Sequence, residues 1–228
     1  MNTKLLGNIV RALGVKPERY RVLRNLKRLL AVGFSAYPYK GFQVEHIGLR
    51  SIIKKGMVVI DIGANVGDYS ILFARWGAKV TAFEPTYIWS TLYKRTRNYD
   101  ICCLNIALGE KDGRIAIYED GGLSSASRKY APKGIRRDID LRRLDTIWKG
   151  LVDFIKIDVE GMELEVLRGA RKTIERYRPI IFCEINEEAQ YARGHTGQEV
   201  INYLKSLGYD CRIFCHIPYY YDILAQVA

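Results

Sequence analysis

From Met57 onward, short apolar runs alternate with segments of helical periodicity, and this alternation constrains the fold more than any other feature of the chain. Apolar runs of this kind are typical of strands buried on both faces, as in a parallel sheet covered by helices. The expected strands are residues 58–62, 79–83, 101–105, 154–158 and 180–185, and the helices between them are about 66–76, 87–97 and 162–177. The pattern predicts an open α/β fold, Rossmann-like, with a mostly parallel sheet and helices on both faces.

The remainder of this domain, taken as residues 57–228, holds smaller features. Residues 109–118, with Asp112-Gly113 at a turn, indicate a hairpin or an excursion from the sheet. A last helix is expected near 197–207, and two final apolar runs, 209–215 and 219–224, flank Pro218. Because proline favours a turn, these runs are expected to pair antiparallel at the edge of the sheet.

Residues 1–56 form an N-terminal extension of a different, basic character. The first 55 residues hold twelve Lys and Arg against two Glu, a net charge of +10, so the rest of the chain adds only +1 to the total of +11. Pro17 is placed to open an amphipathic helix, and a second helix is expected at about 44–53. The apolar face of the first helix carries Tyr20, Leu23, Leu26 and Leu30. Residues 1–55 could contact nucleic acid, a membrane surface or an acidic partner, or form a solvated basic face.

The chain shows no run of about 18 apolar residues and no secretory signal at its start, so we expect a cytoplasmic protein. The five cysteines, at 102, 103, 183, 211 and 215, lack the spacing of a zinc site, and no metal site is predicted. Because they lie in apolar stretches, we expect buried, reduced thiols.

The segment from Val58 to Ser70 carries the clearest chemistry. A buried strand runs into a loop with two glycines, Gly63 and Gly67, and a helix follows at once. Glycine lets a ligand approach the backbone, and the first turn of the helix offers free N–H donors. Glu84 ends the next strand, near the distance from the loop at which an acidic side chain accepts hydrogen bonds from a ribose in βαβ units. These features together predict an adenosine pocket.

The loop also narrows the choice of cofactor. Its glycine spacing differs from the G-x-G-x-x-G of dinucleotide sites, and the Gly-Lys-Ser/Thr of a P-loop does not follow. Asp61 at the strand end would repel a phosphate but attract an ammonium or sulfonium group. This favours an amino-acid-bearing nucleoside such as S-adenosylmethionine.

Six blocks of sequence between residues 61 and 170 follow one another in a characteristic order. They are D-I-G-A-N-V-G-D-Y-S at 61–70, F-E-P at 83–85, N-I-A-L-G-E-K-D-G at 105–113, L-S-S at 123–125, R-R-L-D-T-I at 142–147 and F-I-K-I-D-V-E-G-M-E-L-E-V-L-R-G-A at 154–170. This order resembles the FkbM family of S-adenosylmethionine-dependent methyltransferases. The resemblance implies a class I methyltransferase fold, with seven strands of which the last is antiparallel, and methyl transfer that usually goes to a hydroxyl oxygen.

The resemblance further implies which residues contact the cofactor. The methionine portion would be contacted by Asp61, Gly63, Asn65 and Gly67. Glu84 would bind the ribose hydroxyls, and Asn105 with Ala107 the adenine region. From the same motifs, the cofactor-binding set also includes Ala64, Pro85 and Asp158.

The reacting centre is expected near the end of the fourth strand, because ligands gather outside the carboxyl ends of strands in open α/β sheets. Lys156 and Asp158 point to one face there, Glu160 and Glu163 follow, and Glu184 can approach from the adjacent strand. These groups could act as a general base or orienting group for an acceptor hydroxyl, or as ligands of a divalent cation. Alternatively they are structural, with Lys156 neutralising Asp158 and Glu163 capping its helix.

His195 follows the fifth strand and could serve as a base near neutral pH, although a solvated loop histidine is the simpler interpretation. The catalytic candidates are therefore Asp158, Lys156, Glu184 and His195. The sequence predicts an S-adenosylmethionine-dependent O-methyltransferase acting on a small molecule or a glycan. The alternatives are an RNA methyltransferase that uses residues 1–55 to bind its substrate, and a non-catalytic nucleoside-binding module.

Overall fold

The computed structural model of the chain describes residues 48–120, 124–217 and 219–227. The chain divides into two compact units, Met1–Ile53 and Lys54–Ala228. In the first unit, residues 48–52 are helical, and the helix expected from Pro17 lies outside the described residues. Within the described part of the chain, no helix combines the length and the apolar character needed to span a bilayer.

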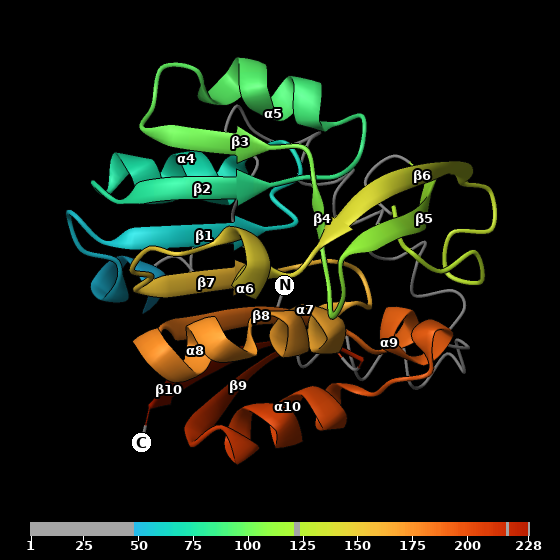
Figure 1. Cartoon of the computed structure of the whole chain (residues 1–228). Helices are drawn as coiled ribbons and strands as arrows, with labels where there is room; N and C mark the ends of the chain where they lie inside the picture. The colour runs from blue at the N-terminus through green and yellow to red at the C-terminus, as the bar shows by residue number, and fades with distance from the viewer. Residues whose placement is uncertain (1–47, 121–123, 218, 228) are drawn as a thin grey trace. The chain divides into compact units, whose positions relative to one another are not determined.

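A seven-stranded sheet forms the centre of the second unit, in the order β3-β2-β1-β7-β8-β10-β9 (Figure 1). Its strands are β1 (Val58–Ile62), β2 (Lys79–Phe83), β3 (Ile101–Leu104), β7 (Phe154–Ile157), β8 (Ile180–Asn186), β9 (Tyr209–Ile217) and β10 (Tyr220–Val227). Neighbouring strands from β3 to β8 are parallel, whereas β10 is antiparallel to both β8 and β9. The predicted mostly parallel sheet is confirmed, together with its antiparallel last strand.

The central strands are apolar because helices cover both faces of the sheet. Ile60, Ile155 and Ile181 lie side by side in β1, β7 and β8 and are each 0% exposed. Burying one such side chain contributes about 1.5–3 kcal/mol to stability. Helix α4 (Asp68–Arg75) packs on β1, β2 and β3 through the fully buried Phe73, and α7, α8 and α10 lie in front of the sheet in Figure 1.

The other helices differ from the expected set, because two of them were not predicted and one expected helix is divided. They are α5 (Trp89–Thr96), α6 (Leu144–Ile147), α7 (Glu163–Gly169), α8 (Arg171–Tyr177), α9 (Glu187–Arg193) and α10 (Gly197–Ser206). The single helix expected over 162–177 is wrong, because the chain breaks at Ala170 between α7 and α8. Asp145, distant in sequence, accepts hydrogen bonds from the N–H groups of Lys172 and Thr173 and so caps α8 as a separate helix.

A second sheet forms the excursion between β3 and β7. It has the order β4-β6-β5, from β4 (Ala107–Leu108), β5 (Gly113–Glu119) and β6 (Ile135–Arg142). The expected hairpin at 109–118 is only its first half, because β5 pairs with the later strand β6. In Figure 1 this sheet lies beyond the carboxyl ends of the parallel strands. It is therefore placed to form one wall of a site at those strand ends.

Among the cysteines whose side chains the structure describes, only Cys183 is buried as expected, while Cys103 and Cys211 are half-buried and Cys102 is exposed. Cys183 in β8 is fully buried, and burial raises the pKa of its thiol well above the ordinary value. Cys102, however, is exposed on β3, the edge strand of the sheet, so the prediction is wrong there. An edge strand has a neighbour on one side only, and alternate side chains can therefore reach solvent.

Candidate functional site

The loop after β1 folds back onto the end of β2. The N–H groups of Gly63 and Ala64 both donate to the carbonyl of Phe83, at 2.9 and 3.0 Å. Asn65 has a φ of +52°, and Gly67 a φ of +89° at the N-cap of α4. Because a left-handed φ favours glycine or asparagine, the sequence of this loop matches its conformation. The backbone of the loop is thereby held beside the first residue after β2, which is Glu84.

Glu84 is a buried carboxylate that joins the loop to its own strand end. Its Oε2 accepts the N–H of Asn65 at 2.9 Å, and its Oε1 accepts the N–H and the hydroxyl of Thr86 at 2.9 and 2.6 Å. A carboxylate has about four acceptor positions, so one more position remains for a donor from a ligand. Burial raises the pKa of Glu84, against the opposing effect of these hydrogen bonds.

A cavity of about 640 Å³ lies beside Glu84. One wall is made by Pro85, Thr86, Tyr87 and Asn105, and the other by residues of β5 and β6. Asn105 stands just past β3 and donates through Nδ2 to the carbonyl of Glu84 at 2.8 Å. Ala107 is buried at the start of β4. The structure therefore brings Pro85 and Asn105 together around one hollow, and Glu84 directly precedes Pro85.

The end of β1 also lies against the end of β7, through a buried group of charges. Lys156 is 3% exposed, and its Nζ lies 3.5 Å from Asp61 Oδ1, 3.3 Å from Asp158 Oδ2 and 3.2 Å from the carbonyl of Gly63. Asp61 is 0% exposed, and its Oδ2 accepts the hydroxyl of Ser70 at 2.6 Å. The Oδ1 atom of Asp61 has no hydrogen-bond partner among the described residues. The predicted pairing of Lys156 with Asp158 is present.

Lys156 is held in its charged form. Burial alone would lower the pKa of its ammonium group, but the carboxylates of Asp158, Asp61 and Glu184 raise it above the ordinary value. A lysine that stays protonated cannot accept a proton from a substrate. Its contribution at this site is therefore a fixed positive charge between Asp61 and Asp158.

Replacing Gly63 with alanine is expected to destabilise the fold strongly. Gly63 has a φ of +77°, and a Cβ there would overlap the carbonyl oxygen of Asp158. Gly194, with a φ of +85°, is a matched control because a Cβ there would meet no described atom within 4 Å. Thermal unfolding should give a loss of about 1 kcal/mol for Gly194→Ala and about 3 kcal/mol or more for Gly63→Ala. Equal losses would contradict the close approach of the two loops.

The sequence that contains these strand ends matches a known protein family. A model of the methyltransferase FkbM domain matches residues 61–211, which contain both strand ends described above. The chain belongs to the FkbM methyltransferase family.

Known methyltransferases resemble this chain at low sequence identity. Methyltransferase sdnD of Sordaria araneosa is 25% identical over 58% of this chain and 67% of its own length. The hexuronic acid methyltransferase AglP of Haloferax volcanii is 26% identical over 54% of each protein. The crystal structure of methyltransferase FkbM from Methylobacillus flagellatus KT has a TM-score of 0.56 at 22% identity, covering 74% of this chain and 43% of that chain. This FkbM-family chain thus spans about half to two thirds of the curated relatives it matches.

A second group of carboxylates in this FkbM methyltransferase lies at the end of β8. Glu184 accepts a hydrogen bond from the hydroxyl of Tyr220, and it stands opposite the buried Asp222 in the register of β8 and β10. Burial raises the pKa of Glu184 well above its ordinary value, and the charges of Asp158 and Asp222 raise it further. The structure therefore brings Glu184 into the electrostatic neighbourhood of Asp158, as expected from the adjacent strands.

Glu160 connects the end of β7 to the second sheet. Its Oε2 accepts the hydroxyl of Tyr130 at 3.1 Å and the Nδ2 of Asn186 at 3.2 Å. Its carbonyl accepts the hydroxyl of Ser125 at 2.8 Å. The segment between β5 and β6 thus packs on the loop that follows β7. Ser125 is 2% exposed and holds that contact.

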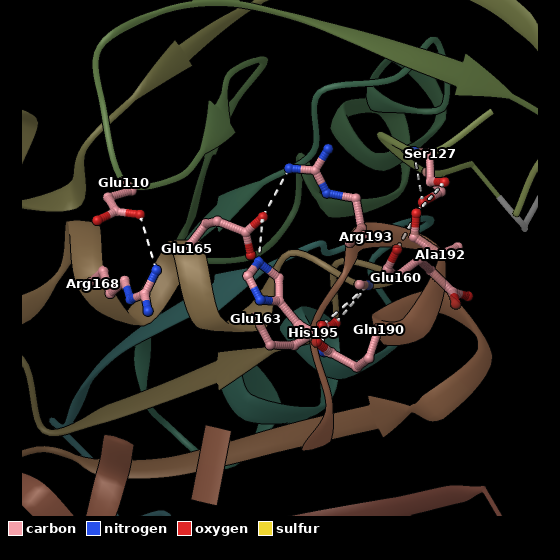
Figure 2. Close-up of polar contacts among 12 residues, drawn as sticks. Glu110, Ser127, Glu160, Glu163, Glu165, Arg168, Gln190, Ala192, Arg193 and His195 are labelled. Atoms are coloured by element: carbon pink, nitrogen blue, oxygen red, sulfur yellow. Dashed lines mark hydrogen bonds and ion pairs between the residues drawn. The ribbon is translucent and has the colours of Figure 1, made fainter. Parts of the chain in front are cut away.

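His195 contacts a different carboxylate, that of Glu165. Its Nε2 lies 3.5 Å from Glu165 Oε1, which also accepts a 2.8 Å hydrogen bond from Arg193 (Figure 2). Among the described residues, no hydrogen bond or ion pair joins His195 to Asp158, Lys156 or Glu184. The structure therefore does not bring this catalytic candidate together with the others.

Several residues of the site were not found from the sequence. Five residues contact or adjoin the predicted carboxylates: Ser70 at Asp61, Tyr220 and Asp222 at Glu184, and Tyr130 and Asn186 at Glu160. Ser70 could have been found, because it lies on the first turns of the helix that follows the glycine loop. The others depend on contacts between segments far apart in the chain. Within the described residues, no group of three or more His, Cys, Asp or Glu side chains could hold a metal ion.

Proposed function

We propose that this FkbM-family methyltransferase uses S-adenosylmethionine and transfers its methyl group to a hydroxyl oxygen of a small molecule or a carbohydrate. The observation that carries the proposal is the convergence of two strand ends around one loop. Glu84 offers a buried carboxylate at the end of β2, and Asp158 stands past the end of β7, on the other side of the glycine loop. A cofactor lying across these strand ends would have its nucleoside at Glu84 and its reactive end at Asp158.

The residues present fit this cofactor. Glu84 keeps an acceptor position for the ribose hydroxyls, and the cavity lined by Pro85 and Asn105 adjoins it. Gly63 and Gly67 let the loop pack closely against the carbonyl of Asp158 and against Leu92. The buried Oδ1 of Asp61 makes no hydrogen bond within the described structure, although the Lys156 ammonium lies 3.5 Å away, and it would face the methionine portion. The bound cofactor would supply an electrophilic methyl group on a positively charged sulfur.

The protein would contribute orientation and proton transfer at the acceptor. A hydroxyl that gains a methyl group must lose its proton, and Asp158 and Glu184 are the carboxylates placed to receive it. Asp158 is partly exposed, with 26% of its side chain accessible, so it can meet an acceptor that enters from solvent. Lys156 keeps Asp158 in place and balances its charge. The raised pKa of Glu184 makes it the stronger base once it is ionised.

The range of acceptors is suggested by the family and by AglP, whose name describes a hexuronic acid methyltransferase. A sugar hydroxyl is therefore the acceptor class that we favour. The net charge of +10 in residues 1–55 favours RNA as a second class. Binding of RNA through that segment would weaken steeply with added salt, whereas binding of a neutral sugar would not.

The proposal is tested with radiolabelled S-adenosylmethionine and fractionated extract of the source cells. We expect label to enter a carbohydrate or small-molecule fraction, and an excess of S-adenosylhomocysteine to suppress it. Label in RNA would support the second acceptor class. If calorimetry detected S-adenosylhomocysteine binding but no fraction took up label, the chain would be a non-catalytic nucleoside-binding module. If S-adenosylhomocysteine did not bind, the cofactor assignment itself would be wrong.

A further inference from the structure

We propose that Glu163 is a positioning residue, a buried carboxylate that holds residues 158–161 in the conformation that presents Asp158 to the acceptor. The proposal rests on the function proposed above for Asp158. Glu163 is the first residue of α7 and is 0% exposed, and within the described part of the chain it forms no ion pair, which is rare for a buried acidic side chain.

The contacts of Glu163 are directed at the loop and at α9. Its carboxylate accepts the N–H of Val159 at 3.2 Å and the N–H of Gly161 at 3.1 Å. It also accepts a hydrogen bond from Nε2 of Gln190, on α9 (Figure 2). The carboxylate also accepts the N–H of Glu163 itself, at the start of α7, but the N–H groups of Val159 and Gly161 belong to the loop before the helix. The carboxylate therefore determines the shape of the loop.

The loop has a conformation that needs such support. Glu160 has a φ of +52°, which is uncommon for a residue other than glycine, and Gly161 has a φ of +105°. Two consecutive left-handed residues turn the N–H groups of Val159 and Gly161 toward the same acceptor. Without a carboxylate at residue 163, the buried N–H of Gly161 would lose its partner, and the loop could relax to other conformations.

Both sides of the proposed active site depend on this loop. On the cofactor side, the N–H of Asp158 donates to the carbonyl of Ile62 at 3.0 Å, and Gly63 lies directly against the carbonyl of Asp158. On the acceptor side, Glu160 accepts hydrogen bonds from the hydroxyl groups of Ser125 and Tyr130. A shift of the loop would therefore move Asp158 relative to both substrates, and small displacements of this kind reduce rates strongly.

The chemistry of Glu163 supports a specific role for a carboxyl group at this position. Burial raises its pKa to about 8, although the hydrogen bonds from its own N–H and from those of Gly161 and Val159 oppose the shift. If the position required only packing, an apolar residue of similar size would avoid the free-energy cost of burying a carboxyl group. A carboxyl group is present here although burial disfavours its charge. The N–H groups of Val159 and Gly161 donate hydrogen bonds to it.

The test compares Glu163→Ala and Glu163→Gln with Glu165→Gln as the matched control. Glu165 lies on the same helix and is also buried, but its carboxylate pairs with Arg193 rather than with the loop. Hydrogen exchange should be about tenfold faster at residues 158–163 in Glu163→Ala and unchanged there in Glu165→Gln. With the labelled acceptor fraction, kcat should fall about 100-fold in Glu163→Ala, while the acceptor KM and the affinity for S-adenosylhomocysteine change less than about threefold.

At a pH above 8, where Glu163 is ionised, Glu163→Gln should give an intermediate loss of kcat, about three- to tenfold, because the amide keeps one oxygen acceptor but turns a donor toward its neighbours. If Glu163→Ala does not fold, Glu163→Gln is the variant that tests whether Glu163 holds the loop. Loop exchange and kcat equal to those of the wild type in Glu163→Gln, or an unchanged kcat in folded Glu163→Ala, would overturn the proposal. A wild-type protein that neither binds the cofactor nor transfers label would instead remove the proposed function, and the exchange measurement would still report on the loop.

Discussion

Replacing Glu84 with alanine is expected to weaken the binding of S-adenosylhomocysteine by about 100-fold or more, as measured by calorimetry. The substitution removes the charged acceptor for the ribose hydroxyls, and each hydrogen bond to a charged group contributes about 1.5–3 kcal/mol. It also removes the group that ties the N–H of Asn65 to the end of β2, so the glycine loop loses part of its support.

Asp68→Ala provides the control for this measurement. Asp68 begins α4 directly after Gly67, but it is paired with Arg95 at 2.8 Å in an exposed position. Its removal should change the affinity by less than about twofold, because exposed ion pairs contribute little. Equal affinities for the Glu84 variant and the wild type would show that the nucleoside lies elsewhere.

The affinity for the cofactor should also depend on pH through Glu84. Its folded pKa is raised by burial, so the carboxylate gains a proton at a higher pH than an ordinary glutamate does. Because the ionised form accepts the ribose hydrogen bonds, affinity is complete above the raised pKa and is lost as the pH falls through it. The pH dependence is measured by calorimetry in buffers of equal ionic strength, and it should be absent from Glu84→Gln.

The second large effect is expected for Asp158→Asn, which should reduce turnover by about 100-fold or more and change the affinity for S-adenosylhomocysteine by less than about threefold. Asparagine keeps the shape of the side chain but can neither accept the acceptor proton nor balance Lys156. The Lys156 ammonium retains Asp61 at 3.5 Å, so the cofactor half of the site should keep its charge balance.

A matched control for this substitution lies at the other end of the same strand. Asp153 precedes β7 and accepts the N–H of Val58 at 2.7 Å, far along the strand from the proposed reacting centre. Asp153→Asn should lower thermal stability slightly and leave turnover within about twofold of the wild type. Full turnover in Asp158→Asn would exclude Asp158 as the base and direct attention to Glu184.

Strands that are buried on both faces were predicted from the sequence more accurately than exposed ones. The predicted bounds agree with the observed bounds to within one residue for β1, β2, β7 and β8. These strands could be predicted because their apolar runs indicate burial on both faces of the sheet. β6 was missed because most of its side chains are exposed and charged, so nothing in its sequence separates it from a loop. α9 was missed as well, and its start depends on the side chain of Asn186, which accepts the N–H groups of Glu188 and Ala189.

The proposed cofactor half of the site could be outlined from the sequence because its parts lie close together in the chain. The loop from Gly63 to Gly67 and the strand end at Glu84 belong to one βαβ unit, whose geometry is nearly constant. The acceptor half was only partly predictable. Glu184 and Asp158 were expected from adjacent strands, but Tyr220 reaches Glu184 only through the antiparallel pairing of β10, and Tyr130 reaches Glu160 from the segment between β5 and β6.

By itself, the sequence determined the parallel sheet, the glycine loop and the carboxylate at the end of β2, because local periodicity and spacing set these features. Only the tertiary structure decided which side chains surround Asp158, why one expected helix is two, and why His195 faces Glu165 instead. The physical reason is that such contacts join segments distant in the chain. Their register is set by packing of the whole domain, and no local pattern of residues records it.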